Sequence, residues 1–318
     1  MTGLVWLALG AVMLVGGAEL FAENVASAAR RVGLTALALG VLLAGAEPEE
    51  ALTAGIASGR GHPQLAVGDA IGANFVILTL ALGLAAVFTT LPVSRRVRQY
   101  AGGAALSGLV ALGVLADGSV GRVEGALVVV VYALAVCWVW WRERTPPTIG
   151  EMAESELPEH DRGRGEDDPD PPSRSALVLT LSGVVLMVLG GWLAVTGADR
   201  VVTGLGLDDT GVGLTLLALA TSAEMLALVV AAARHRVAEV AVAGLVGAVA
   251  YNATVSLGVG ALVAPLHGVG EARLLLVAAA CSLLPLTLFV LGRSGAVSRW
   301  GGGVLVVAYL TAVPLLLV

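Results

Sequence analysis

The chain alternates long apolar runs with short polar breaks that contain Arg, Pro or Gly. About 20 apolar residues in a helix are enough to cross the hydrocarbon core of a bilayer. Ten runs come near or exceed this length, so the pattern predicts an all-α membrane protein with ten transmembrane helices. The first five runs cover residues 4–22, 34–57, 65–88, 101–116 and 125–141, and the second five cover residues 176–198, 211–233, 240–265, 274–291 and 302–318.

The composition supports this prediction. Of the 318 residues, 57% are hydrophobic and only 13% are charged, and the mean hydropathy is +0.90. These values exclude an ordinary water-soluble domain. The net charge of −6 is mostly local, because nine of the 24 acidic residues lie between Glu151 and Asp170. It therefore indicates no acidic or basic partner for the whole chain.

A polar segment separates the two sets of apolar runs. Residues 142–174 are rich in Pro, Glu, Asp and Arg, a composition typical of a solvated, disordered linker. We therefore predict a first repeat at residues 1–141, an acidic linker at residues 142–174 and a second repeat at residues 175–318. The linker is interpreted as a flexible tether, with regulatory cation binding as the alternative.

Arginine placement predicts the orientation of the helices. The loops after the odd-numbered helices hold fourteen of the 18 arginines, and those after the even-numbered helices hold four. Basic residues concentrate in cytoplasmic loops, so the linker is expected in the cytoplasm and both termini outside the cell. The location that we expect is the inner (plasma) membrane. The sixth helix then enters the membrane from the side opposite to the first.

The two halves also resemble each other in sequence. Residues 12–17 (VMLVGG) match residues 186–191 (LMVLGG) at an offset of 174. At an offset of 175, Glu49 falls on Glu224, and a glycine of the third run falls on one of the eighth. Similar halves of opposite orientation predict two inverted five-helix repeats. This architecture is common among secondary transporters, whose substrate site lies near the membrane midplane.

Carboxylates interrupt the second apolar run. Glu47, Glu49 and Glu50 flank Pro48 within a span-length segment. An acid at mid-bilayer costs roughly 2.5–3.5 kcal/mol, so these side chains are expected to face protein, water or a cation. Pro48 breaks the helix and frees carbonyl oxygens near Ala44. Carboxylate and carbonyl oxygens suit Ca²⁺, Na⁺ or protons, and they do not suit soft metals.

Further oxygen-bearing residues lie in the third, seventh and eighth runs. Hydroxyls in a membrane helix can bend it and can also coordinate a cation. Helix packing remains the alternative for the hydroxyl residues, and interhelical hydrogen bonding remains the alternative for the Asn residues. For Glu47 and Glu50 the alternative is a place near the water interface. We predict a cation site formed by Glu49 and Glu224 and supported by Asp69, Asn74, Thr221, Ser222 and Asn252, with Glu47 and Glu50 as second candidates.

These residues resemble a known family. Residues 213–222 (GLTLLALATS) are similar to the start of the second alpha-repeat of sodium/calcium exchangers, in the cation/Ca²⁺ antiporter superfamily. Residues 234–242, followed by Gly247 and Asn252, resemble the continuation of that repeat. Gly68, Gly72 and Asn74 resemble the first repeat. The resemblance implies two inverted repeats whose acids, hydroxyls and later Asn or Asp residues bind Ca²⁺ and Na⁺. It also implies transport by alternating access.

Several motif positions differ from the family pattern Gly-Thr-Ser-x-Pro-Glu. The Thr-Ser pair of the first motif is Ala46-Glu47 in this chain. By spacing, the family's acid falls on Glu50 and Met225, whereas the acids that match between the halves lie one position earlier. The extra carboxylates favour proton coupling as an alternative, since a partly buried Glu can titrate near neutral pH.

The sequence therefore predicts a secondary active cation antiporter that exchanges Na⁺ for Ca²⁺, with a cation/proton exchanger on the same fold as the alternative. A polytopic membrane enzyme is disfavoured, because no histidine lies inside a predicted span and no hydroxyl nucleophile has an evident base. A degenerate exchanger acting as a sensor or scaffold is a third interpretation. We expect inorganic cations and the lipid bilayer as partners, and no cofactor, nucleic acid or protein partner.

Overall fold

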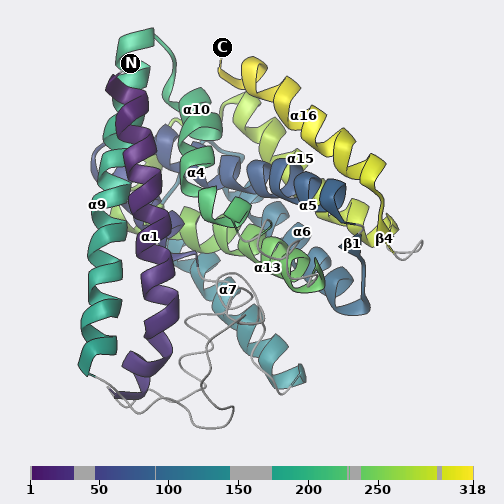
Figure 1. Ribbon diagram of the computed structural model, residues 1–318. Helices are drawn as coiled ribbons and strands as arrows, with labels where there is room; N and C mark the ends of the chain where they lie inside the picture. The colour runs from purple at the N-terminus through teal and green to yellow at the C-terminus, as the bar shows by residue number, and fades with distance from the viewer. Residues whose placement is uncertain are drawn as a thin grey trace.

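The computed structural model describes residues 2–31, 47–89, 91–143, 174–227, 229, 238–291 and 296–317. Within these ranges the secondary structure is helical apart from four strands of two residues each (Figure 1). The predicted all-helical membrane fold is confirmed. The carbonyl groups expected to be freed near Ala44 and most of the predicted linker lie outside the described residues.

The first half of the chain begins with the long helix α1 and continues through shorter elements. A π-helix, η1, joins α4 and α5 into one continuous helical segment. The elements are α1 (Thr2–Arg31), α3 (Pro48–Gly59), α4 (Pro63–Phe75), η1 (Val76–Ala81), α5 (Leu82–Phe88), β1 (Leu91–Pro92), α6 (Arg95–Leu115), β2 (Ser119–Val120) and α7 (Arg122–Glu143).

The second half repeats this plan. The elements are α9 (Arg174–Leu205), α10 (Asp209–Val212), η2 (Gly213–Leu217), α11 (Ala218–Thr221), α13 (Ala238–Tyr251), η3 (Asn252–Ser256), α14 (Leu257–Val263), β3 (Leu266–His267), α15 (Ala272–Leu291), β4 (Ala296–Val297) and α16 (Arg299–Leu317). Among the described residues, five helical segments are long and apolar enough to cross a membrane. They are Thr2–Val25, Pro63–Phe88, Ser175–Leu205, Gly244–Val263 and Arg299–Leu317.

Proline and small polar residues set the helix starts. Pro48 and Pro63 occupy the first turns of α3 and α4, where the missing N–H would have no partner in the helix. Asp208 caps α10, because its Oδ1 accepts a hydrogen bond from the Gly211 N–H at 2.7 Å. The same carboxylate pairs with Arg273 Nη2 at 2.5 Å, and Arg273 Nη1 donates to the Leu316 carbonyl at 2.9 Å. This contact ties the starts of α10 and α15 to the end of α16.

Three π-helices widen the inner helices, and each contains a threonine that bonds back to the preceding turn. Thr79 in η1 donates to the Phe75 carbonyl. Thr215 in η2 donates to the Gly211 carbonyl at 2.6 Å, and Thr254 in η3 donates to the Ala250 carbonyl at 2.6 Å. Hydroxyls that bond in this way bend helices, and π-helical turns are frequent at functional sites. Since η1 and η3 occupy equivalent places in the two halves, the irregularity is part of the repeat.

The short strands pair across the two halves. β1 of the first half pairs antiparallel with β4 of the second, and β2 of the first pairs with β3 of the second. In chain order, β1 corresponds to β3 and β2 corresponds to β4. Each pair therefore joins the earlier strand of one half to the later strand of the other, as expected of two repeats related by a two-fold axis.

Helices α1 and α9 are the longest helices and lie side by side at one edge of the molecule (Figure 1). A Cβ atom added to Gly10 would lie 2.6 Å from the Ala194 nitrogen, and one added to Gly190 would lie 2.8 Å from the Leu14 nitrogen. Such close backbone contact requires glycine at the interface. The glycines of this interface recur every seventh residue on both helices, at Gly3, Gly10 and Gly17 and at Gly183, Gly190 and Gly197.

Burial separates the inner helices from the outer ones. The segment Pro63–Phe88 contains α4, and 78% of its most apolar stretch is buried inside the protein. The corresponding share for α16 is 17%. Helix α4 packs against α3, α10, η2, α11 and α15, and it therefore lies in the interior. Its polar side chains face protein, while most of α16 faces the bilayer.

Candidate functional site

Two hydrogen bonds between acids and hydroxyls join the halves of the chain in the interior. The Thr221 hydroxyl at the end of α11 donates to Asp69 Oδ1 in α4 at 3.0 Å. The adjacent Ser222 hydroxyl donates to Glu50 Oε1 in α3 at 3.2 Å. All four side chains are at most 1% exposed. Four of the polar side chains that the sequence singled out, two from each half, therefore meet at one buried point.

Two interrupted helices bring these groups together. Helix α3 begins at Pro48, so Glu49 and Glu50 lie in its first turn, where the helix dipole favours negative charge. In the second half, α11 ends at Thr221, and Ser222 leaves the helical conformation with φ −78° and ψ 11°. A helix begins at Pro48, as predicted, and the residues immediately before Glu47 lie outside the described ranges. The second half reaches a corresponding break at Ser222 without a proline.

Two glycines allow α4 to approach the second half. A Cβ atom added to Gly68 would lie 3.0 Å from the Gly213 Cα, and one added to Gly72 would lie 2.5 Å from the Leu214 carbonyl oxygen. Both neighbours belong to η2, the segment that leads into α11. Because Asp69 lies between the two glycines, this close packing holds its carboxylate beside Thr221.

The three acids around Pro48 differ in their surroundings. Glu50 has Asp69 and Glu49 as charged neighbours, whereas Glu47 is a charged neighbour of Tyr132 in α7. Glu47 and Glu50 are 1% and 0% exposed, so both carboxyl groups face protein. Their depth in the membrane stays a prediction. Glu50 accepts a hydroxyl hydrogen bond from Ser222 of the second half. The assignment of Glu49 as the principal ligand of the first half stays a prediction.

Glu224 is also buried, and it lies two residues beyond the break at Ser222. Met225, at the position of the family's second acid, is fully buried in the hydrophobic core. The second half therefore offers a carboxylate one position before the place where the family pattern has one. The role of Glu224 as a ligand stays a prediction.

The predicted amides lie on the helices that surround α3. Asn74 lies in the last turn of α4, and Asn252 begins η3, which packs against α3 and α4. Asn252 Oδ1 accepts a hydrogen bond from the Ser256 hydroxyl at 3.2 Å, within its own helical segment. Both amide side chains are buried, which is compatible with interhelical hydrogen bonding and with a ligand role.

Several buried polar atoms of the site have no hydrogen-bond partner among the described residues. They are Glu50 Oε2, Asp69 Oδ2, Asn74 Oδ1, Asn252 Nδ2 and Thr53 Oγ1. A buried polar atom without a partner costs about 1–3 kcal/mol, so such atoms are rare unless a ligand satisfies them. Neither Glu50 nor Asp69 forms an ion pair with any described basic residue. The unpaired oxygens fit a cation.

Thr53 was not among the predicted site residues. It lies one turn after Glu49 and Glu50 on α3, and its hydroxyl is fully buried. Its spacing of four residues from Glu49 was the signal that the sequence offered. Within the described ranges, no group of three or more His, Cys, Asp or Glu side chains is arranged to hold a metal ion. Ion binding here would therefore draw on hydroxyl and amide oxygens as well as carboxylates.

Comparisons with known proteins agree with this architecture. The family model for sodium/calcium exchanger protein matches residues 2–141 and 175–318. The "Putative antiporter CaxA" of Alkalimonas amylolytica is 27% identical over 316 residues, covering 96% of each chain. The polar segment that we predicted as a linker lies between the two matched parts.

Solved structures of the sodium-calcium exchanger NCX_Mj share the fold. The structure soaked with 2.5 mM Na⁺ and 10 mM Sr²⁺ has a TM-score of 0.63 and 22% identity, and covers 98% of both chains. The structure soaked without Na⁺ and Ca²⁺ has a TM-score of 0.60 and 23% identity, and covers 99% of this chain and 98% of that one. Together with the family match, these structures show that the protein is a multi-pass membrane transporter rather than an enzyme. The chain belongs to the sodium/calcium exchanger family of cation antiporters.

Proposed function

We propose that the protein exchanges Ca²⁺ for Na⁺ across the membrane at the buried site between α3, α4 and the break after α11. The observation that carries the proposal is the pair of hydrogen bonds from Thr221 to Asp69 and from Ser222 to Glu50. Each bond joins an acid of the first half to a hydroxyl of the second. A cation bound between these groups would be shared by both halves.

The chemistry of the site suits hard cations. Ca²⁺ binds six to eight oxygen ligands drawn from carboxylates, carbonyls and amides, and it tolerates irregular geometry. The unpaired oxygens of Glu50, Asp69 and Asn74 supply carboxylate and amide ligands from two neighbouring helices. Hydroxyls at Thr53, Thr221 and Ser222 add neutral oxygens, which suit the lower charge of Na⁺.

The position of the site supports alternating access. Its ligands come from both repeats, so a movement of one repeat against the other would open the site to one side of the membrane and close it to the other. We place residues 142–174 in the cytoplasm, both termini outside and the protein in the inner membrane, on the basis of the arginine distribution.

A second candidate function is exchange of Ca²⁺ or Na⁺ for protons. Five acids, Glu47, Glu49, Glu50, Asp69 and Glu224, are buried in the interior of the protein. Their full ionisation would exceed the charge of one Ca²⁺, and uncompensated charge is unfavourable away from water. Some of these carboxyl groups are therefore expected to carry protons in part of the transport cycle.

The experiment is ⁴⁵Ca²⁺ uptake into proteoliposomes under an outward Na⁺ gradient, compared with a pH gradient alone. Uptake that requires Na⁺ supports the first function, and uptake driven by the pH gradient without Na⁺ supports the second. Glu50→Gln should abolish either flux, whereas Glu271→Gln, which alters an exposed acid beside Arg273, should leave it unchanged. Absence of ⁴⁵Ca²⁺ flux under both gradients from correctly folded protein would contradict exchange of Ca²⁺ for Na⁺ and exchange of Ca²⁺ for protons.

A further inference from the structure

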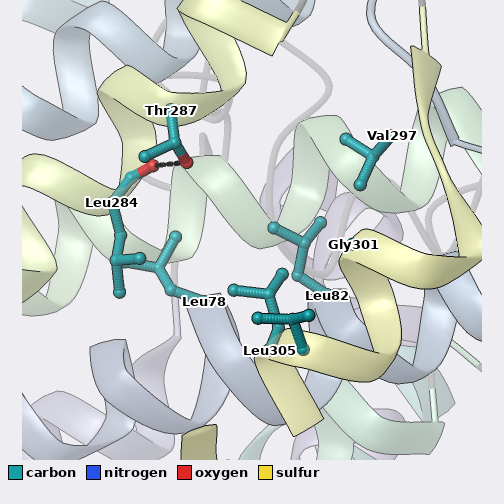
Figure 2. Close-up of a pocket in the computed structure, with 8 residues that line it drawn as sticks. Leu78, Leu82, Leu284, Thr287, Val297, Gly301 and Leu305 are labelled. Carbon is teal, nitrogen blue, oxygen red and sulfur yellow. Dashed lines mark hydrogen bonds between the residues drawn. The ribbon is translucent and has the colours of Figure 1, made fainter.

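A cavity of about 280 Å³ lies away from the cation site, between η1, α5, α15 and α16 (Figure 2). Leu78 of η1 and Leu82 of α5 form one wall, and Leu284 of α15 and Leu305 of α16 face them. Thr287 is the polar side chain of the lining, and its hydroxyl donates to the Leu284 carbonyl at 2.5 Å. The cavity therefore offers an apolar surface to its contents, and it does not suit a cation.

The cavity opens toward the bilayer. Val304 of α16 contributes to its lining and is 64% exposed. Only 17% of the most apolar stretch of α16 is buried inside the protein. Because the surface of this helix faces hydrocarbon in the membrane, the molecules that can enter the cavity from that side are lipids.

A basic and an aromatic residue stand next to the lining residues in the sequence. Val297 at the end of β4 and Gly301 in the first turn of α16 both line the cavity. Between them in sequence are Arg299, which is exposed, and Trp300, which is 87% exposed. Arg299 makes no ion pair with any described residue. Trp is enriched where protein crosses from hydrocarbon to headgroups, and Arg binds phosphate through charge-assisted hydrogen bonds.

We propose that this cavity binds an anionic phospholipid, with one acyl chain against Leu78, Leu82 and Leu305 and the phosphate group against Arg299. The apolar walls match the acyl chain, and Arg299, which makes no ion pair with any described residue, matches an anionic headgroup. One basic residue near the membrane surface contributes about 1 kcal/mol toward an anionic lipid, or about a fivefold preference over a zwitterionic lipid.

The bound lipid would contact the segment that leads out of the cation site. Leu78 lies in η1, four residues after Asn74 of α4. An acyl chain in the cavity therefore packs against the π-helix that is continuous with the helix carrying Asp69 and Asn74. The lipid site and the cation site share one helical segment.

Two glycines of α16 provide a matched pair of test variants. A Cβ atom added to Gly301 would make only ordinary contacts, with Ser298 Oγ and Val297 Cγ1 both at 3.6 Å. Gly301→Leu should therefore add a side chain at the cavity wall without a backbone clash at its Cβ atom. Gly303 does not line the cavity, and a Cβ atom added there meets nothing within 4 Å. Gly303→Leu therefore adds the same side chain to the same helix outside the proposed site.

Native mass spectrometry of the full-length protein can measure retention of phosphatidylglycerol and of phosphatidylcholine with identical acyl chains. The unmodified protein and Gly303→Leu should retain phosphatidylglycerol about fivefold more strongly. Gly301→Leu should lose retention of both lipids, and Arg299→Gln should lose the preference alone. Equal retention of the two lipids by the unmodified protein would overturn the proposal.

Two further results would also contradict the lipid site. One is retention by Gly301→Leu that equals retention by Gly303→Leu, because the cavity would then be irrelevant. The other is an unchanged preference in Arg299→Gln. This exposed substitution makes no demand on core packing, so it tests the proposal even if Gly301→Leu fails to fold.

Discussion

The close packing of α1 against α9 predicts opposite effects for two alanine substitutions on the same helix. A Cβ atom at Gly10 would lie 2.6 Å from the backbone nitrogen of Ala194, and one at Gly16 would meet nothing within 4 Å. Replacing an interior helical glycine by alanine stabilises a helix by roughly 0.5–1 kcal/mol. Overpacking a tight interface destabilises it by roughly 1–3 kcal/mol. Gly16→Ala should therefore stabilise the protein, and Gly10→Ala should be less stable than Gly16→Ala by roughly 1–3 kcal/mol.

Thermal unfolding in detergent, followed by circular dichroism, measures the difference between the two variants. Gly190→Ala on α9 should behave like Gly10→Ala, because its Cβ atom would lie 2.8 Å from the Leu14 nitrogen. The double variant should lose less stability than the sum of the two losses, since one separation of the helices relieves both contacts. Equal stability of Gly10→Ala and Gly16→Ala would refute the reasoning, because the intrinsic helix propensities of the two variants are the same.

Two further predictions concern single polar contacts. Thr221→Val removes the hydrogen-bond donor to Asp69 at nearly constant volume, so the apparent Ca²⁺ affinity in the flux assay should fall roughly tenfold or more. The affinity of Thr221→Ser should stay near that of the unmodified protein. An equal loss in both variants would show that the hydroxyl is not the cause. Burial opposes ionisation of Asp208, but the hydrogen bonds from Arg273 and Gly211 outweigh it and lower its pKa. A lowered pKa means that the pair stabilises the fold fully above the ordinary Asp pKa of about 4 and loses that contribution as the pH falls below it. In unfolding measurements, Arg273→Gln should remove this part of the acid dependence, and an unchanged profile would contradict the assignment.

Hydropathy was sufficient to predict the membrane fold. Backbone N–H and C=O groups in lipid must form hydrogen bonds with each other, so a long apolar run that crosses the membrane is expected to be a helix. The run at residues 176–198 became part of α9, and the run at residues 302–318 became α16. The break at Pro48 was readable because a proline lacks the N–H of a helix interior. The break at Ser222 was harder to predict, because no proline marks it. The helix ends there where the Thr221 hydroxyl makes its contacts and packs.

The sequence could not rank the acids of the site. In a run that is apolar on all sides, periodicity does not show which face meets a neighbouring helix. The direction of Glu47 toward Tyr132, and of Glu50 toward Ser222, depends on the start of α3 and on how closely Gly68 and Gly72 let α4 approach. Thr53 was missed for another reason: the hydroxyl of a threonine in a membrane helix usually bonds to the backbone of its own helix.

The strand pairs have a consequence for the order of folding during synthesis. β1 is made early, but its partner β4 emerges only near the end of the chain, and β2 likewise waits for β3. The first half cannot complete its contacts before the second half has been inserted, so the two repeats should fold as one cooperative unit rather than one after the other. The same interlocking means that a cut between residues 143 and 174 should leave two fragments that remain associated.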